Sequence, residues 1–349
     1  MPIFLVLSGP RANSQPLLEK MNHSDVLVIG AGISGLLCAT ELQRAGMRVR
    51  VVDKGRGFGG RMATRRMAGG RLDHGAQFFT VRDARFQSYV DEWLEAGVVR
   101  EWFRHAPEDS NPNGYPRYCG VHGMTDAPKY LGQSLDVVRA ERITELSREV
   151  DRWMARGESG AQFTADYLVL TSPAPQALSL LDTTGLNYAG PDTNRLRAIR
   201  YSKGLATLAI LDGPSGLPDC GFVRLVQSPL AWIADNRAKQ ISPDVHAITI
   251  HADAEFAEAH WDSPNELRGP LMLEAAKAWL GSEVVEYNCH RWGFTTPLNP
   301  WHEKHFTNPS LRLTLAGDSF GGARVEGAAL SGIEASAAVL NAIGETSRV

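Results

Sequence analysis

Short apolar runs and a helical stretch alternate at the start of the folded part of this chain. The run Val-Leu-Val-Ile at 26–29 predicts a buried strand, and a β-rich run at 49–52 predicts another. A helical pattern of apolar positions lies between them. Strand, turn, helix and strand in this order predict a βαβ unit, in which the two strands run parallel.

A different pattern appears in the second half of the chain, where short β-rich runs follow one another with turns between them. These runs lie at 206–211, 221–226, 230–234 and 247–251. Such spacing predicts an antiparallel sheet, distinct from the parallel sheet of the first unit. Helices are predicted at 85–97, 126–135, 264–280 and 327–343, and further strands at 141–146, 167–171 and 311–316.

A glycine motif, Gly30-Ala31-Gly32-Ile33-Ser34-Gly35, joins the first strand to the first helix. Gly30 allows a tight turn, Gly32 lets a pyrophosphate approach the backbone, and Gly35 lets the helix pack on the strand. The helix N-terminus offers N–H groups and partial positive charge to phosphates. Asp53 ends the second strand, where a carboxylate can accept both ribose hydroxyls of an adenosine. This context predicts a bound dinucleotide rather than an ordinary glycine turn.

The segment after Asp53 favours FAD over NAD as that dinucleotide. It holds a second glycine-rich loop, Gly55-Arg56-Gly57-Phe58-Gly59-Gly60-Arg61-Met62, and then Asp73-His74-Gly75-Ala76-Gln77-Phe78-Phe79. A nicotinamide dehydrogenase has no use for another phosphate-binding loop directly after its ribose acid. A flavoprotein uses such a loop to cover the pyrophosphate of an extended FAD and to bring an arginine to it.

A third glycine-rich turn lies near the end of the chain. Gly317-Asp318 follows the strand predicted at 311–316, and Val325-Glu326-Gly327-Ala328 leads into the last helix. The N-terminus of that helix can place N–H donors and positive dipole beside the N1–C2=O edge of a reduced flavin. Alone, this turn fits an ordinary surface turn equally well. Together with the two N-terminal loops, it predicts contacts along the whole length of FAD.

Composition excludes several other classes of protein. The 349 residues are 43% hydrophobic and 21% charged, as in soluble globular proteins, and the net charge of -3 makes nucleic acid an unexpected partner. The four cysteines, Cys38, Cys119, Cys220 and Cys289, form no CxxC pair, so we expect reduced, mostly buried thiols in a cytoplasmic protein. Residues 1–23 lack a basic n-region and are expected to be a loose extension. No apolar run approaches the roughly 20 residues of a membrane span, so no membrane association is expected.

These segments resemble the FAD-dependent amine oxidase superfamily, and in particular its renalase branch. GAGISG at 30–35, GGRM at 59–62 and GD…EGA at 317–328 correspond to the flavin-binding signatures of the superfamily. The stretches DKGRGFGGRMATRR, DHGAQFFTVRDARF, SPLAWIADNRAK at 228–239, HRW at 290–292 and GDSFGGARVEGAALSG look like bacterial renalases. The resemblance extends from about Ser24 to Asn341.

The resemblance implies roles for individual residues. FAD-binding positions would be Gly30, Gly32, Ser34, Gly35, Asp53, Lys54, Gly60, Arg61, Gln77, Phe78, Ile143, Asp318, Glu326, Gly327 and Ala328. Gln77 and Phe78 would lie along the isoalloxazine, and the backbone at Ile143 would contact adenine. Phe78 replaces a tyrosine of some members, so a hydroxyl contact would be absent. Phe78, Asn236 and Trp292 would surround the substrate, and FAD would be held without a covalent bond.

The resemblance also implies the fold and its division into domains. We expect an α/β fold, α+β overall, with a Rossmann-like FAD-binding domain and a second domain built on a mixed sheet. The FAD-binding domain would be discontinuous, formed by 22–80, 122–175 and 305–345. A substrate domain formed by 81–121 and 176–304 would cover the flavin.

The activity implied is that of an oxidase acting on the 2-dihydro and 6-dihydro isomers of NAD(P)H. Hydride transfer to FAD would give NAD(P)+, and dioxygen would reoxidise the flavin and yield hydrogen peroxide. A dihydropyridine needs no general base, because its product is an aromatic pyridinium. The alternatives are an amine oxidase or desaturase acting on a small metabolite, and a flavin-binding regulatory protein without turnover.

Three further residues were candidates for chemistry. Some flavin amine oxidases hold a lysine near the flavin, and Lys203 could take that role, although an exposed loop position is the simpler interpretation. His302 and His305 would share a helix face, but they lack a third ligand, so no metal site is expected.

Overall fold

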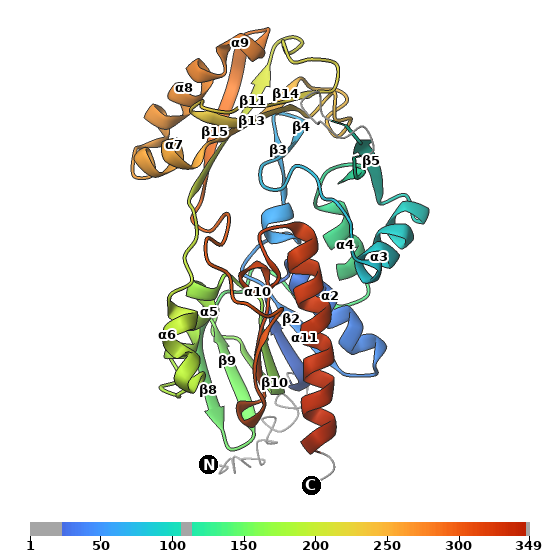
Figure 1. The fold of residues 1–349 in the computed structure, drawn as a ribbon, viewed down its shortest axis with the longest axis vertical. Helices are drawn as coiled ribbons and strands as arrows, with labels where there is room; N and C mark the ends of the chain where they lie inside the picture. The colour runs from blue at the N-terminus through green and yellow to red at the C-terminus, as the bar shows by residue number, and fades with distance from the viewer. Residues whose placement is uncertain (1–22, 106–113, 347–349) are drawn as a thin grey trace, which may run out of the picture.

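The computed structural model describes residues 23–105 and 114–346, which form two lobes joined by several crossing segments. The lower lobe in Figure 1 is built on an eight-stranded sheet, and the upper lobe on a five-stranded sheet. Most of the extension predicted at 1–23 and most of the loop before Pro116 lie outside the described residues.

The large sheet contains the predicted βαβ unit. Its path runs β16-β17-β10-β1-β2-β7, and the hairpin β8–β9 continues from β10. The strands are β1 (His23–Ile29), β2 (Val49–Val52), β7 (Asp136–Val138), β8 (Ile143–Glu149), β9 (Arg152–Gly157), β10 (Gln162–Leu170), β16 (Phe306–Asn308) and β17 (Leu313–Leu315). β1 pairs in parallel with both β2 and β10, and β10 with β17. This confirms the parallel sheet predicted from the apolar runs.

Two helices cover one face of this sheet. The first is α2 (Ile33–Arg44), and the second is the long terminal helix α11 (Val325–Thr346). They approach so closely that a Cβ added at Gly332 would lie 2.1 Å from the carbonyl oxygen of Ser34. At Gly332, α11 thereby packs directly against the first glycine loop.

The terminal helix corrects one expectation from the sequence. The segment Val325–Gly344 is long and apolar enough to cross a membrane by length and composition, with a mean hydropathy of 1.2. The expectation that no apolar run approaches such a length was therefore wrong. Its residues Ala329, Ala335 and Val339 are buried in the core that α11 shares with α2, which is the packing of a core helix.

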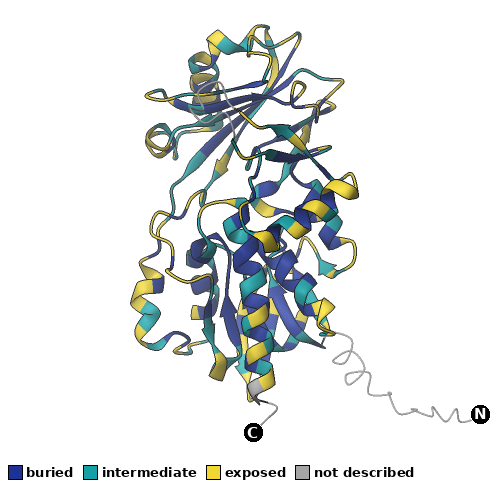
Figure 2. Ribbon diagram, turned by 45° about the vertical axis from the view of Figure 1, so that its right-hand side comes forward, coloured by how far each residue is buried: buried dark blue, intermediate teal, exposed yellow. Residues whose placement is uncertain are grey.

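The other face of the sheet is covered by α5 (Ala174–Asp182), α6 (Thr193–Arg197) and the neighbouring η2 (Gly190–Asp192). The short elements η3 (Pro309–Leu311) and α10 (Asp318–Gly321) lie on either side of β17 in the sequence. In Figure 2 the strands are mostly dark blue, and the exposed residues lie largely on the outer sides of the helices. The strands are therefore enclosed between layers, as in other α/β folds.

The upper lobe is the antiparallel sheet predicted from the second half of the chain. Its order is β12-β13-β14-β11-β15. The strands are β11 (Gly204–Leu211), β12 (Phe222–Arg224), β13 (Leu230–Asp235), β14 (Ala247–Ala252) and β15 (Val284–Trp292). Helices α7 (Ala254–Ala259), α8 (Asn265–Ala275) and α9 (Lys277–Leu280) line its outer face. β15 was not predicted, and the helix predicted at 264–280 is divided at Ala276.

Smaller elements connect the lobes. They are η1 (Gly60–Met62), the hairpin β3 (Thr64–Met67) and β4 (Gly70–Asp73), α3 (Ala84–Glu95), the pair β5 (Val99–Phe103) and β6 (Arg117–Gly120), and α4 (Asp126–Gly132). The β3–β4 hairpin packs on β11 and β14 of the upper lobe. α3 and β5 share a core with α2 and α11. Residues 81–121, which contain both elements, were expected to belong to the substrate domain. The domain boundaries remain a prediction.

Candidate cofactor and substrate site

The first glycine loop has the geometry that its sequence requires. Gly30 adopts φ +120°, and a Cβ at Gly35 would lie 1.9 Å from the carbonyl oxygen of Gly30. Gly32 precedes the first turn of α2, and no heavy atom lies within 4 Å of the place where its Cβ would be. The loop therefore packs tightly on its protein side and leaves space above Gly32. Backbone N–H groups of a helix N-terminus beside such a space suit a phosphate.

Asp53 ties the first glycine loop to the second. Its Oδ2 accepts a hydrogen bond from Ala31 N at 2.6 Å, and its Oδ1 accepts one from Gly55 N at 2.5 Å. The N–H of Glu141 bonds the carbonyl of Asp53, which brings the segment before Ile143 alongside. A carboxylate has lone pairs beyond these two contacts, so ribose hydroxyls can still bind it. The neighbouring Lys54 is exposed.

The second glycine loop lies directly on the first. Gly59 N donates to Ala31 O at 2.9 Å, and Gly32 and Gly59 form a parallel bridge. A Cβ at Gly60 would meet only Gly32 Cα, at 3.8 Å. The structure thus brings together Gly30, Gly32, Gly60 and Asp53, and encloses a backbone-lined space that side chains leave open.

Arg61 and Asp318 meet although they are far apart in the sequence. The guanidinium forms a two-point ion pair with the carboxylate, with N–O distances of 2.5 and 2.6 Å, and Tyr201 donates its hydroxyl to Asp318 Oδ1 at 2.8 Å. Burial opposes the charged form of Arg61, but the hydrogen bonds and charge of Asp318 outweigh it and raise the pKa of Arg61. Arg61 is therefore always charged, but its guanidinium is paired with Asp318 and also donates to the carbonyls of Phe294 and Thr295, so its contact with a pyrophosphate remains a prediction.

The turn from Asp73 to Phe78 carries the residues expected along the isoalloxazine. Gln77 is buried, and its Nε2 donates to Asp73 O at 2.6 Å and to Gly75 O at 3.2 Å. Its Oε1 is buried without a partner among the described residues. The ring of Phe78 contacts Phe103 and Trp232, with centroid distances of 5.4 and 5.7 Å.

The start of α11 is fixed by Glu326. Its Oε1 accepts hydrogen bonds from Arg82 N at 2.6 Å and Asp83 N at 2.8 Å. A Cβ at Gly327 would lie 2.6 Å from the carbonyl oxygens of Gly321 and Gly322. The Glu326 carboxylate therefore shapes the turn, while Gly327 and the adjacent Ala328 allow close passage of the chain.

Unpartnered buried atoms test whether these residues fit a dinucleotide. Ser34 Oγ in the first loop has no partner among the described residues, and neither has Gln77 Oε1. A buried polar group without a partner costs stability, and a group bound beside the glycine loops could supply a partner to these two atoms. Beside them lie the open backbone at Gly32 and Gly60 and the cation of Arg61. This set fits a dinucleotide cofactor.

The five-stranded sheet carries a group of polar side chains on the face that packs on the β3–β4 hairpin. Ala206 of β11 pairs with His251 on one side and His290 on the other, so both histidines share one face of the sheet. By the same alternation Thr249, Asn288 and Trp292 lie on that face. The opposite face carries Leu205, Ala209, Ile233, Ile248 and Ile250, which pack with the helices in an apolar core. We call the first set the polar face.

His74 connects the polar face to the turn at Asp73. Its imidazole stacks on Trp292 at 5.1 Å between centroids and meets the edge of His290 at 5.0 Å. Trp292 Nε1 donates to the carbonyl of His74 at 2.8 Å. Burial lowers the pKa of His74 to about 3, with further contributions from His290, once that residue is protonated in acid, and from the cation Arg65. Burial lowers the pKa of His251 to about 4 and also lowers that of His290, so all three are neutral at neutral pH.

The three residues expected around the substrate therefore lie in different surroundings. Trp292 belongs to the polar face, and Phe78 to an aromatic cluster with Trp232. Asn236 is fully buried, accepts from Asp73 N at 3.3 Å, and donates to Ala247 O and Thr249 Oγ1 at 3.2 and 3.0 Å. Its amide is engaged inside the protein, and its contact with substrate remains a prediction.

Two lysines differ sharply in environment. Lys203 pairs with Glu258 at 2.9 Å and its amine lies 5.3 Å from the ring centre of Trp261. Lys239 is completely buried and pairs with Asp73 at 2.7 Å. From the sequence, Lys203 was considered as a lysine near the flavin. Lys239, His251 and His290 were not recognised as candidate site residues. The quoted motifs SPLAWIADNRAK and HRW contain Lys239 and His290, but only strand pairing shows where their side chains lie.

One group of side chains in the described residues could hold a metal ion: His23, Asp25 and Asp166. It lies at the start of β1, at the opposite end of the strand from Gly30. Asp25 already pairs with Arg48 at 2.5 Å. No metal site is expected from the sequence, and this group lies apart from the glycine loops.

Comparison with known proteins agrees with this geometry. Residues 28–93 match the family described as NAD(P)-binding Rossmann-like domain, and residues 111–340 match flavin containing amine oxidoreductase. Renalase from Mus musculus is 23% identical over 290 residues, which cover 78% of this chain and 85% of the mouse protein. The fold resembles a triple mutant of putrescine oxidase, with a TM-score of 0.71 at 14% identity over 91% of this chain and 99% of the other. Wild-type putrescine oxidase bound to putrescine gives a TM-score of 0.70 at the same identity and coverage.

The predicted cofactor and fold are therefore confirmed. FAD is the cofactor, the fold is α/β with a Rossmann-like domain, and the protein is an FAD-dependent oxidoreductase. The four cysteines are free, as expected. Because one family model matches well over half of its length, this chain belongs to the flavin containing amine oxidoreductases, as a renalase-like member of the FAD-dependent amine oxidase superfamily.

Proposed function

We propose that this flavoprotein oxidises the 2-dihydro and 6-dihydro isomers of NAD(P)H to NAD(P)+, with dioxygen as the final acceptor and hydrogen peroxide as the second product. The similarity to mouse renalase over most of both chains supports the proposal. The neutral imidazoles of His251 and His290 on the polar face, with Trp292 packed against His290, are the observation that carries it.

The polar face combines neutral imidazoles with side chains that are already bonded. Thr249 accepts from Asn236 and Asn288 accepts from Arg65 at 2.8 Å, while the lowered pKa values of His251 and His290 keep both imidazoles neutral at neutral pH. A dihydronicotinamide ring and its carboxamide are also neutral, so they can pair with such a face without burying a charge. A protonated amine would instead favour a carboxylate on that face.

FAD, when bound, accepts two electrons with a proton and passes them to dioxygen. The protein's own residues have to bind and orient the substrate ring. Trp292 is held by its bond to the His74 carbonyl and by stacking on the His74 imidazole, so it can present a fixed aromatic surface. No side chain has to remove a proton, because loss of hydride alone makes the ring aromatic.

The test is anaerobic mixing of the FAD-loaded protein with 2-dihydro-NAD, 6-dihydro-NAD, ordinary NADH and a panel of amines. We expect fast bleaching of the flavin by the two isomers, little by NADH and none by amines. The 2-dihydro and 6-dihydro isomers of NADPH, mixed in the same way, show whether NAD or NADP is the preferred dinucleotide. Bleaching by amines alone would assign an amine oxidase, and bleaching by no reductant in the panel would favour a flavin-binding protein without turnover; either result rejects the proposal.

A further inference from the structure

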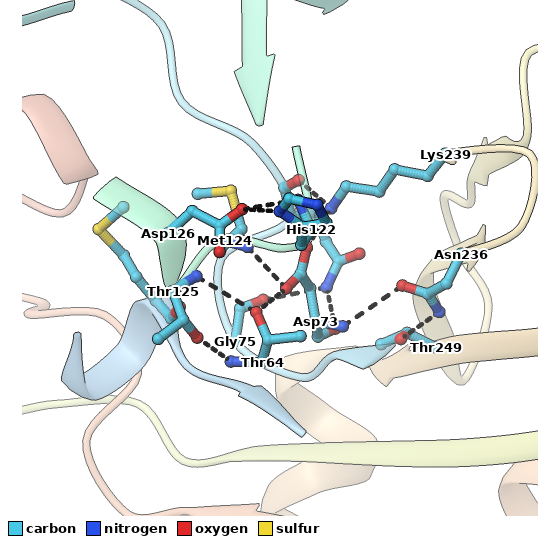
Figure 3. Close-up of polar contacts among 12 residues, drawn as sticks. Thr64, Asp73, Gly75, His122, Met124, Thr125, Asp126, Asn236, Lys239 and Thr249 are labelled. Atoms are coloured by element: carbon cyan, nitrogen blue, oxygen red, sulfur yellow. Dashed lines mark hydrogen bonds and ion pairs between the residues drawn. The ribbon is translucent and has the colours of Figure 1, made fainter. Parts of the chain in front are cut away.

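Lys239 occupies an unusual position for a lysine. It follows β13 in the upper lobe, and none of its surface is exposed. Its ammonium donates to Asp73 Oδ2 at 2.7 Å and to the main-chain carbonyl of Gln77, and lies 4.7 Å from the ring centre of Trp102. Figure 3 shows Lys239 reaching toward Asp73 from the segment that also carries Asn236.

Asp73 is bonded on every side. Its Oδ1 accepts from Met124 N at 2.9 Å and from the Thr64 hydroxyl at 2.5 Å, in addition to the Lys239 ammonium on Oδ2. Its main-chain N–H donates to Asn236 (Figure 3). The pair therefore joins the β3–β4 hairpin, the segment before α4 and the segment after β13. Lys239 and Asn236 contribute the contacts from the upper lobe.

A buried ion pair contributes little net stability, because the desolvation of two charges offsets most of their attraction. Such a pair instead fixes the relative positions of the segments that it joins. Here the ammonium binds both ends of one turn, the carboxylate of Asp73 and the carbonyl of Gln77. Between those ends lies His74, which stacks on Trp292, and Gln77 at the second end has a side-chain Oε1 without a partner among the described residues.

We propose that Lys239 is a positioning residue for flavin reduction: it closes the turn from Asp73 to Gln77 and so fixes Gln77 and His74 between the cofactor and the polar face. Lys239 acts through this turn and not by contact with the reacting atoms. The inference rests on the proposed function only for the choice of reductant, because Lys239 holds the turn from Asp73 to Gln77 whichever substrate the protein oxidises.

The experiment compares Lys239→Met, Lys239→Arg and the double variant Lys239→Met/Asp73→Asn with wild type. The double variant avoids leaving a carboxylate buried without its counter-charge, which makes it the safer variant to fold. Lys203→Met is the matched control, because that lysine pairs with Glu258 away from the turn. Each FAD-loaded protein is measured for the dissociation constant of FAD, the visible spectrum and midpoint potential of the flavin, and its anaerobic reduction by 2-dihydro-NAD.

We expect the double variant to fold and retain FAD, with an altered flavin spectrum and potential. Its limiting rate of flavin reduction should fall roughly 10- to 100-fold, as expected for a displacement of about 1 Å in a positioned group. The apparent dissociation constant of the reductant should change much less. Lys239→Arg should recover part of the rate, and Lys203→Met should match wild type.

A double variant with lowered thermal stability but unchanged spectrum, potential and limiting rate would overturn the proposal, because Lys239 would then only support the fold. The same conclusion follows if Lys203→Met slows reduction equally. If wild type is not reduced by 2-dihydro-NAD, the proposed substrate fails on its own. The flavin spectrum and potential still decide the role of Lys239, since neither depends on that substrate.

Discussion

The buried histidine His74 makes the free energy of unfolding depend on pH. Its contribution can be measured separately from those of the other titratable groups. The perturbation is the substitution His74→Leu, studied at two pH values. His74 is buried, and its Nδ1 has no partner among the described residues, so an apolar side chain of similar bulk removes this unsatisfied atom together with the hydrogen bond of the imidazole to the Ala63 backbone. Its stacking on Trp292 is lost in the same variant.

The magnitude follows from the pKa of His74, which burial and neighbouring positive charge lower from 6.5 to about 3 in the folded protein. A histidine with a lowered folded pKa stabilises the fold above its unfolded pKa, and that stability is lost as the pH falls toward the folded pKa. At about pH 5 the unfolded chain has gained the proton and the folded protein has not. Because pH 5 lies about 1.5 units below the pKa of an unfolded histidine, the free energy of unfolding falls by about 2 kcal/mol between neutral pH and about pH 5.

The assay is urea unfolding of wild type and His74→Leu, with FAD in equal excess, at about pH 7.5 and about pH 5. Lower pH should weaken wild type relative to the variant by about 2 kcal/mol. Contributions from His251 and other groups occur in both proteins and cancel in this difference. His302→Leu, at an exposed position, controls for the loss of a histidine. An equal difference between wild type and His74→Leu at both pH values would refute the assignment of a buried, neutral His74.

Three further substitutions test the site. Asp53→Ala should weaken FAD retention, measured after dialysis, because the ribose hydroxyls lose their acceptor and two glycine-loop N–H groups lose theirs; unchanged occupancy would reject this role. Trp292→Ala should slow flavin reduction in stopped flow while FAD stays bound, and an unaltered rate would leave Trp292 as a packing residue only. Gly35→Ala should cost about 1–3 kcal/mol of stability and reduce FAD binding, because its Cβ would meet Gly30 O at 1.9 Å; normal FAD binding in a titration would contradict the tight loop.

The parallel half of the fold could be predicted because local signals agree there. Apolar runs, glycine positions and the acid at Asp53 all lie within one contiguous βαβ unit, so neighbours in sequence are neighbours in space. The short strands of the second sheet were predicted from their turns. β15 was missed because nearly all of its residues are exposed or half-buried, with charged and polar side chains among them. Such a strand lacks an apolar run.

The side chains opposite the glycine loops could not be predicted, because their arrangement depends on pairing between distant strands. His251 and His290 come together only because β11 lies between β14 and β15, and each pairs with Ala206. Lys239 pairs with Asp73, which lies 166 positions away in the sequence. No local pattern carries the information that fixes these pairs, since it lies in strand order and register. Resemblance to a family could direct attention to the segments but not to the contacts.

The two lobes differ in the kind of surface that they turn toward each other. We infer that the lower lobe determines FAD binding and that the upper lobe determines substrate specificity. The lower lobe offers backbone N–H groups, glycines and the cation Arg61, which suit the phosphates of a dinucleotide and leave little room for variation. The upper lobe offers side chains from antiparallel strands, where one substitution changes the polar face without disturbing the apolar core behind it. Enzymes of one fold can therefore share FAD and differ in substrate. In this chain the neutral imidazoles and Trp292 occupy that variable face, and substitutions there should change which molecule reduces the flavin before they change whether FAD binds.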